Sequence, residues 1–342
     1  MSGASLAAAP AVGPRLARPR LGFLGVGWIG RHRMAAIAAE GSADIVAVAD
    51  PSADNLAEAV AAAPGSVAVD SLDALLDHGL DGLVIATPSA LHAEQAIRAL
   101  DQGVAVFCQK PLGRNAAEVE AVLAAAQSAD RLLGVDLSYR HTAAMVAVRQ
   151  ALQDALIGNV HAVDLIFHNA YGPDKPWFYD PSLAGGGCVI DLGVHLVDLA
   201  LWALDWPAVA EVASSLYANG VSLTDPSATV EDLAFATLTL ANGATMRLAC
   251  SWRLPAGCDA VIAADFYGPH GALRMRNIGG SFYDFTAEHC QGTARTALTS
   301  PPDEWGGRAA MAWARRLTRD RSFDPSAMRL LDVAAVLDRI YA

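Results

Sequence analysis

The sequence predicts an N-terminal α/β domain with a doubly wound parallel sheet, followed by an α+β domain with an open, mainly antiparallel sheet. Short apolar runs alternate with alanine-rich amphipathic segments from residue 21 to about residue 136, which is the rhythm of βαβ units. A glycine-rich turn follows the first apolar run, and longer β-branched runs begin after residue 156. The 342 residues, 53% of them hydrophobic, are enough to build two domains.

The first domain, residues 21–140, is expected to contain six short buried strands separated in most cases by helices. Ser and Asn residues stand where these helices would begin, as N-caps do. Residues 1–20 consist mainly of Ala, Pro, Gly and Arg and are interpreted as a disordered N-terminal extension. The expected strands are Leu21–Gly25, Ile45–Ala49, Val67–Val69, Leu83–Ala86, Val104–Phe107 and Leu132–Val135.

The second domain, residues 141–342, is expected to bind the substrate. Helices are predicted at Thr142–Leu156 and Ser326–Tyr341. Asn242-Gly243 predicts a hairpin with a type I′ turn, because both residues tolerate positive φ. Helices on one face of a broad sheet would leave its other face open, so we expect a homodimer or homotetramer through this sheet. The expected strands are Val160–His168, Val209–Tyr217, Leu233–Leu240, Thr245–Trp252 and Ala260–Tyr267.

Charge and composition argue against several classes of partner. The net charge is −12 and no dense basic block is present, which disfavours nucleic acid. The sequence has no uninterrupted apolar run of membrane-spanning length and no apolar signal region after its first charges, so a cytoplasmic protein without a membrane partner is expected. Its five scattered cysteines include no CxxC pair, which disfavours a disulfide scaffold or structural zinc.

A dinucleotide fingerprint opens the first helix. Gly25, Gly27 and Gly30 follow the first strand directly, where such glycines permit a tight turn, close approach of a pyrophosphate and helix–strand packing. Asp50 ends the second strand, twenty residues past Gly30. A carboxylate there accepts from the adenosine ribose and repels a 2′-phosphate, which favours NAD over NADP. The alternative is an ordinary turn residue, because Asp50 precedes a proline.

Two further segments are predicted at the same sheet edge. Thr87-Pro88 follows the fourth strand and Gln109-Lys110 follows the fifth, at the carboxyl ends where open α/β sheets bind ligands. Thr87 has a structural alternative, the approach to the helix after it. Only two of the 24 basic residues are lysines. The proline after Lys110 fixes an extended backbone, so the compact charge of this lysine is predicted to point at the nicotinamide end of the crevice.

A polar motif in the second domain carries the predicted catalytic pair. Asp191 and His195 are four residues apart after the triplet Gly185-Gly186-Gly187, so a helix would place both on one face. The glycines would let substrate or cofactor approach the backbone. A structural Asp–His pair is the alternative, but histidine suits the base that a dehydrogenase needs.

Two other interpretations of polar residues are weaker. A metal site would use Asp191, His195 and Asp198, with His161 or His168 as an optional further ligand, but it lacks the second histidine of common zinc helices. We therefore expect no metal. Tyr171 and Lys175 have the spacing of a short-chain dehydrogenase pair, yet the glycine and prolines around them prevent the helix that this pair requires.

These motifs together resemble the glucose-fructose oxidoreductase / inositol dehydrogenase / MocA (Gfo/Idh/MocA) family, from about Leu21 to Ala342. The resemblance rests on Gly25-Val-Gly-Trp-Ile-Gly30, Ala86-Thr-Pro-Ser-Ala-Leu-His92, Cys108-Gln-Lys-Pro-Leu112, the motif from Gly185 to His195, and Tyr267-Gly with Gly271-Ala-Leu273. It implies NAD(H)-dependent oxidation of a secondary alcohol on a sugar, inositol or polyol. It also implies that Lys110, Asp191 and His195 form the catalytic set. Gln109 departs from the family, which usually has Glu there.

The expected site therefore has three sets of residues. The catalytic set is the one just named. The cofactor-binding residues are Gly25, Gly27, Trp28, Ile29, Gly30, Asp50, Thr87, Pro88, His92, Gln109 and Lys110. Candidate substrate contacts are Arg140, His168, Tyr171 and Trp177, although aromatic residues are more often core and Arg140 could form a salt bridge at the domain junction. The rival functions are a two-domain reductase of an imine, enone or tetrapyrrole, and a non-catalytic NAD-binding regulator.

Overall fold

The first sheet is parallel throughout and begins at Arg20. The computed structural model describes residues 18–342, so most of the predicted N-terminal extension lies outside the described residues. The strand order is β3-β2-β1-β4-β5-β6, a doubly wound sheet whose order reverses beside β1. All six predicted strands are confirmed, at β1 (Arg20–Leu24), β2 (Asp44–Ala49), β3 (Val67–Val69), β4 (Gly82–Ile85), β5 (Ala105–Cys108) and β6 (Leu133–Val135).

Helices follow most of these strands and are capped by the expected residues. Ser52, Ser71 and Asn115 each accept a backbone N–H of the first turn, whereas Ser89 is the first helical residue and Pro88 is the cap. The helices are α1 (Trp28–Glu40), α2 (Ala53–Ala62), α3 (Leu72–Leu76), α4 (Ser89–Asp101) and α5 (Ala116–Ala129).

The second sheet has nine strands, ordered β15-β14-β13-β12-β7-β11-β10-β8-β9. Its pairs are antiparallel except β7 with β11. The five predicted strands are confirmed and four were missed; β15 is almost fully exposed along its length, so its sequence shows no buried alternation. The strands are β7 (Ala162–Asn169), β8 (Val209–Ala218), β9 (Val221–Ser222), β10 (Leu233–Leu240), β11 (Thr245–Ser251), β12 (Ala260–Gly268), β13 (Gly271–Asn277), β14 (Phe285–Gln291) and β15 (Ala294–Thr299).

The predicted hairpin forms, but its turn differs from the expected type I′. Gly243 has a φ of 86°, whereas Asn242 is not among the positive-φ residues. The Gly243 N–H donates to Leu240 O at 2.9 Å. The turn is therefore closed by Gly243, the residue in the left-handed conformation, which stands after the two central residues of the turn. This is the common geometry of a longer hairpin loop.

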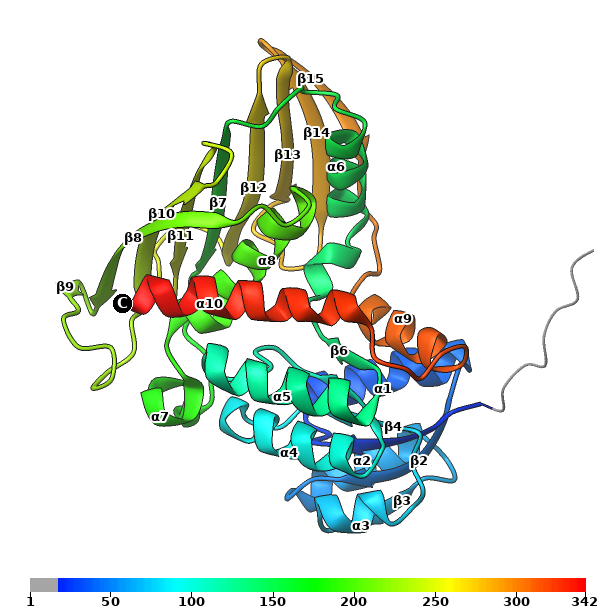
Figure 1. The fold of residues 1–342 in the computed structure, drawn as a ribbon. Helices are drawn as coiled ribbons and strands as arrows, with labels where there is room; N and C mark the ends of the chain where they lie inside the picture. The colour runs from blue at the N-terminus through cyan, green and yellow to red at the C-terminus, as the bar shows by residue number, and fades with distance from the viewer. Residues whose placement is uncertain (1–17) are drawn as a thin grey trace, which may run out of the picture.

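One face of the second sheet is covered by helices, and short helical segments lead into them (Figure 1). Pro181–Ala203 is long and apolar enough to cross a membrane, but 83% of its most apolar window is buried within the protein. Its apolar surface is therefore used within the core. The segments are η1 (Ser138–His141), α6 (Ala143–Gln153), η2 (Pro176–Tyr179), α7 (Pro181–Ala184), the π-helix η3 (Val189–Gly193) and α8 (Val194–Ala203).

The C-terminal helices return to the first domain, which the assignment of residues 141–342 to one domain did not anticipate. In α9 (Arg308–Leu317), Trp313 packs 5.6 Å from the Phe107 ring. A Cβ on Gly82 or Gly134 would collide with this indole. An apolar face of a parallel sheet must be covered, and here a distant segment covers part of it.

The last helix bridges both domains, crossing between them in Figure 1. It is α10 (Arg329–Tyr341), preceded by η4 (Pro325–Met328). Its Asp338 accepts the Ala116 N–H at the start of α5 at 3.0 Å. Its Arg339 donates to Val209 O on β8 at 2.7 Å. The carboxyl end of the chain is thus fixed against the second sheet.

Candidate active site

The glycine loop has the geometry that a dinucleotide requires. Gly25 has a φ of 84°, and a Cβ on it would collide with the Ala86 carbonyl. A Cβ on Gly30 would collide with the Gly25 carbonyl oxygen, so this glycine permits close helix–strand packing. A Cβ on Gly27 would meet nothing within 4 Å. Open space therefore lies where a pyrophosphate would approach the backbone.

The start of α1 is free to bind an anion. Gly27 is its N-cap and provides no side-chain cap, and the Arg31 N–H makes the first helical bond to Gly27 O at 3.0 Å. The preceding amides, those of Trp28, Ile29 and Gly30, point beyond the helix end, where partial positive charge favours phosphate. The Trp28 side chain is 64% exposed beside this loop. The residues present fit a dinucleotide.

Asp50 lies between the glycine loop and α2. Its carboxylate accepts the Val26 and Ser52 N–H groups, each at 2.8 Å, and the Asn55 amide at 3.1 Å. Arg31 donates to the side-chain oxygen of Asn55 at 2.8 Å. Asp50 therefore contacts the loop that would bind the dinucleotide, as its position after β2 predicts.

His92 joins two loops at the carboxyl edge of the sheet. Its ring is 1% exposed. Nδ1 lies 2.6 Å from Pro111 O and Nε2 lies 2.7 Å from Thr87 O. Both nitrogens thus face the protein, so the predicted cofactor contact of His92 is wrong and its position is structural. The Thr87 hydroxyl donates to Gln95 at 2.6 Å, and Pro88 caps α4.

Gln109 belongs to a buried polar cluster around Asp136. The Gln109 amide and the Ser138 hydroxyl donate to the Asp136 carboxylate, and Arg33 Nε lies 2.5 Å from it. Asp136 is 1% exposed. It provides a carboxylate next to the position where the family usually has Glu. The sequence analysis missed Asp136, although its place after β6 puts it at the ligand-binding edge.

Lys110 meets Asp191 across the domain boundary. Lys110 Nζ lies 2.6 Å from Asp191 Oδ1 and 2.7 Å from Asp191 O. The other carboxylate oxygen accepts Trp252 Nε1–H at 3.0 Å. An ammonium has three N–H groups, so these contacts leave one N–H for a ligand. Trp252, 3% exposed, was missed because a tryptophan at the end of a strand looks like core.

The Asp191–His195 hydrogen bond expected from their spacing is not formed. Asp191 lies in the π-helix η3, whereas His195 lies in α8. The wider π-helical turn changes the relative direction of side chains four residues apart. Within the described residues, His195 Nδ1 is buried without a hydrogen-bond partner. Asp191 therefore contacts Lys110 and makes no hydrogen bond to His195; of its two predicted roles, orienting His195 or the substrate, the second stays a prediction.

The His195 ring is held by aromatic packing. It is 8% exposed and lies edge-on to Tyr139, with ring centroids 4.8 Å apart. Phe167 lies 6.4 Å away. Burial lowers the pKa of His195 well below its ordinary value, and the positive charges of Lys110 and Arg33 lower it further. The imidazole is therefore neutral near pH 7 and able to accept a proton.

The glycine triplet was predicted to let substrate or cofactor approach the backbone, and this prediction is wrong. A Cβ on Gly185 would meet Arg114, one on Gly186 would meet the Tyr341 hydroxyl, and one on Gly187 would meet the Glu231 carbonyl. Protein groups therefore fill all three spaces. The triplet lets three distant segments approach the start of η3.

The candidate substrate contacts do not gather as a group. Arg140 binds Asp198, with Nε 2.6 Å from Oδ2, so its predicted substrate role is replaced by the salt bridge. His168 Nδ1 lies 2.8 Å from the Ser251 hydroxyl oxygen, and its substrate contact stays a prediction. Tyr171 is exposed and donates to Asp259. Trp177 stacks on Phe178 with centroids 3.8 Å apart.

The described residues form neither the metal site nor the short-chain dehydrogenase pair that were considered as weaker interpretations. Residues 18–342 contain no group of three or more His, Cys, Asp or Glu placed to hold a metal ion. Asp198 is bound to Arg140 rather than turned toward Asp191. Lys175 lies in a loop and pairs with Asp174 at 3.0 Å. Tyr171 and Lys175 therefore lack the helix that a short-chain dehydrogenase pair needs.

Comparisons with known proteins agree with this geometry. Residues 20–137 match the oxidoreductase family with an NAD-binding Rossmann fold, and residues 145–274 match the GFO/IDH/MocA C-terminal domain. An inositol 2-dehydrogenase of Rhizobium meliloti (strain 1021) is 31% identical over 262 residues, covering 75% of this chain and 76% of that protein. The chain belongs to the Gfo/Idh/MocA family.

Two solved structures have the same fold as this chain. A levoglucosan dehydrogenase in complex with NADH has a TM-score of 0.80 at 20% identity and covers 95% of this chain and 96% of its own. A 3-ketoreductase from Actinomadura kijaniata with NADP has a TM-score of 0.80 at 21% identity, covering 95% and 97%. This Gfo/Idh/MocA protein is therefore an oxidoreductase whose first domain has the NAD-binding Rossmann fold.

Proposed function

We propose that this Gfo/Idh/MocA oxidoreductase interconverts a secondary alcohol and a ketone on a sugar, inositol or related polyol. The carrying observation is the contact of Lys110, from the first domain, with Asp191, from the helical segment that leads to His195. The charge of Lys110 also acts on the His195 imidazole, whose pKa it lowers, which supports placing a proton acceptor and a compact positive charge at one site. Both are what removal of hydride and proton from one CH–OH group requires.

In the proposed reaction, the neutral imidazole of His195 accepts the hydroxyl proton. The free N–H of Lys110 donates to the same oxygen as it gains negative charge. An ammonium about 4 Å from an alkoxide contributes roughly 4 kcal/mol at an effective dielectric near 20. Asp191 and Trp252 hold the ammonium in place. A nicotinamide bound at the Rossmann edge supplies the hydride acceptor.

NAD is the proposed cofactor, favoured over NADP. Asp50 carries a negative charge where the adenosine ribose of a dinucleotide would lie, and it is already held against the loop by Val26 N–H. A 2′-phosphate would meet this charge. Relatives of this fold are seen with each cofactor, so the local carboxylate is the argument for NAD.

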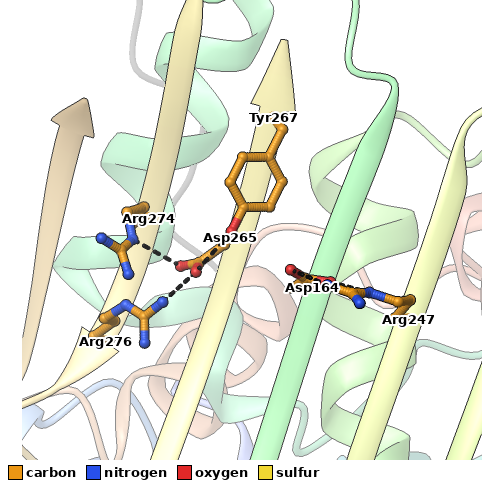
Figure 2. Close-up of polar contacts among 6 residues, drawn as sticks. All are labelled: Asp164, Arg247, Asp265, Tyr267, Arg274 and Arg276. Atoms are coloured by element: carbon orange, nitrogen blue, oxygen red, sulfur yellow. Dashed lines mark hydrogen bonds and ion pairs between the residues drawn. The ribbon is translucent and has the colours of Figure 1, made fainter. Parts of the chain in front are cut away.

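We also propose that a second copy of the chain covers the open face of the nine-stranded sheet. Figure 2 shows that this face carries charges already neutralised within it: Asp265 lies between Arg274 and Arg276, and Asp164 binds Arg247 at 2.6 Å. Asp265 is 2% exposed. Paired charges on a flat face with an exposed Phe235 suit a self-complementary contact between identical sheets.

The proposed localisation is the cytoplasm. The five free cysteines fit this reducing compartment.

A substrate panel tests the proposed reaction. The purified protein is incubated with inositols, sugars and other polyols and either NAD⁺ or NADP⁺, and reduced nicotinamide is followed by absorbance. Turnover of at least one polyol, lost in Lys110→Arg, supports the proposal. Reduction of an imine, enone or tetrapyrrole with no polyol turned over would contradict it, as would dinucleotide binding without any turnover.

A further inference from the structure

We propose that Glu231 and Tyr341 are positioning residues for Asp191, so that the carboxyl end of the chain takes part in aligning the active site. The proposal rests on the proposed function, in which Asp191 holds the ammonium of Lys110. It begins from the finding that protein groups, and not ligand space, lie against the glycine triplet. Two of the residues that supply these groups, Glu231 and Tyr341, are hydrogen-bonded to each other.

Glu231 holds the beginning of the segment that carries Asp191. Its side chain is fully buried. One carboxylate oxygen accepts the Val189 N–H at 2.8 Å, and the carboxylate also accepts the Gly187 N–H at 3.0 Å. The Glu231 main-chain oxygen accepts the Cys188 N–H at 3.1 Å. One residue thus takes three successive amides that a helix start leaves unsatisfied.

These amides lead directly to the catalytic carboxylate. The Asp191 N–H donates to Gly187 O at 3.0 Å, so Asp191 is one hydrogen bond away from the anchored glycine. Asp232, the residue after Glu231, holds a side-chain partner of Asp191: the Asp232 carbonyl accepts the backbone N–H of Trp252 at 2.8 Å. Trp252 in turn donates to Asp191. Two consecutive residues therefore fix both the backbone and a side-chain partner of Asp191.

Tyr341 completes the arrangement from the last helix. Its hydroxyl donates to Glu231 Oε1 at 2.8 Å, and it occupies the space that a Cβ on Gly186 would need. The helix that delivers it also contacts α5 of the first domain through Asp338. Lys110 comes from that domain. The last helix is therefore tied both to the domain of Lys110 and, through Tyr341, to the segment of Asp191.

The contact between Glu231 and Tyr341 depends on the charge of the Glu231 carboxylate. Only the ionised Glu231 carboxylate leaves both oxygens free of a proton, so that they accept from the two amides and the Tyr341 hydroxyl together. Burial raises the pKa of Glu231, and the bonds from Val189 N–H, Tyr341 and Gly187 N–H lower it. The Cys188 thiol also lies close to Glu231, and burial raises the pKa of Cys188, so this thiol stays neutral. Loss of the Tyr341 bond would thus raise the pKa of Glu231.

The test uses Tyr341→Phe, which removes one hydroxyl, and Glu231→Gln, which removes the charge. Glu120→Gln on the exposed face of α5 is the control. For each variant kcat, the KM of the polyol, the pH profile of kcat and the dissociation constant of NADH are measured. We expect kcat to fall about threefold or more in Tyr341→Phe and about tenfold or more in Glu231→Gln. A tenfold fall in kcat corresponds to about 1.4 kcal/mol of activation free energy. NADH binding should change by less than twofold.

The pH profile separates positioning from general stabilisation. His195 is protonated at low pH in every variant, so the readout is the loss added by Glu231: in Tyr341→Phe the acid limb of kcat should become steeper and lie at higher pH than in the unchanged protein, because Glu231 then takes up its proton at a higher pH. An unmoved acid limb with unchanged kcat in Tyr341→Phe would overturn the proposal, and so would equal losses of kcat, NADH affinity and melting temperature. Asp191→Asn is measured in parallel: full activity in that variant would reject the catalytic role of Asp191 itself, a failure of the proposed function rather than of the Glu231–Tyr341 contact.

Discussion

The ammonium of Lys110 lies 2.6 Å from the carboxylate of Asp191, although 81 positions separate the two residues in the chain. Lys110 follows a strand of the parallel sheet, and Asp191 lies in a π-helix of the second domain. Their side chains are about one-fifth exposed or less. This ion pair closes the site between the domains, and it leaves His195 free of a hydrogen bond to Asp191.

Substitution of Lys110 by arginine should abolish turnover while leaving cofactor binding intact. Arginine keeps the charge, but its planar fork cannot reproduce the compact contact with Asp191 and an alkoxide. We expect kcat to fall by about 100-fold or more, since about 4 kcal/mol of charge stabilisation is at stake. Stopped-flow turnover and NADH fluorescence titration measure the two effects. Lys175→Arg in the exposed loop is the control, and equal kcat in both variants would refute the role of Lys110.

The acid limb of the kcat profile should lie below pH 6.5. His195 must be neutral to accept a proton, so activity is present above its pKa and disappears as the pH falls through it. Burial and the charges of Lys110 and Arg33 lower that pKa. His195→Ala should reduce kcat by about 10² to 10⁴. A limb above pH 7, or near-normal rates in His195→Ala, would assign the base to another group.

Asp50→Asn should improve use of NADP⁺ relative to NAD⁺. The substitution removes the negative charge that a 2′-phosphate would meet and leaves one of the two oxygens that accept from Val26 N–H and from Ser52 N–H. The ratio of kcat/KM for the two cofactors should shift toward NADP⁺ by about tenfold or more, an estimate based on like charges several ångströms apart. The adjacent exposed Asp54, changed to Asn, should leave the ratio unchanged. An unshifted ratio in Asp50→Asn would remove the argument for NAD.

Removing the Asp136 carboxylate should strongly destabilise the first domain. Arg33 is 6% exposed and its Nε lies 2.5 Å from Asp136, so Asp136→Ala leaves a buried guanidinium unpaired. Loss of one partner of a buried pair costs about 3–5 kcal/mol. Chemical unfolding measures this loss. The exposed partner Asp73, changed to Ala, should cost about 1 kcal/mol or less because its pair with Arg98 is solvated.

A charge on the open sheet face should dissociate the proposed oligomer. Phe235 is 47% exposed on β10. Phe235→Asp would place an unpaired carboxylate in a contact between two sheets, where its desolvation is costly. Sedimentation velocity should show a change from dimer or tetramer to monomer. Val146→Asp on helix α6, 53% exposed, is the control and should keep the assembly. A wild-type monomer would end this proposal.

The sequence by itself determined the two-domain architecture, the glycine fingerprint and the identity of Lys110, Asp191 and His195 as polar residues at notable positions. These features are local: strand periodicity, caps and turn glycines depend on residues a few positions apart. It could not determine Trp252, Asp136 or Glu231. Each contacts the site from a distant part of the chain, and none stands in a recognisable motif.

Only the tertiary structure decided what the polar residues do to one another. A regular helix would pair Asp191 with His195, but the π-helical turn redirects Asp191 to Lys110 and Trp252. The glycine triplet admits Glu231 and Tyr341 instead of a ligand. Helix α9 covers a sheet that lies far earlier in the chain. Packing between remote segments sets these contacts, and the local sequence carries no record of which segment will arrive.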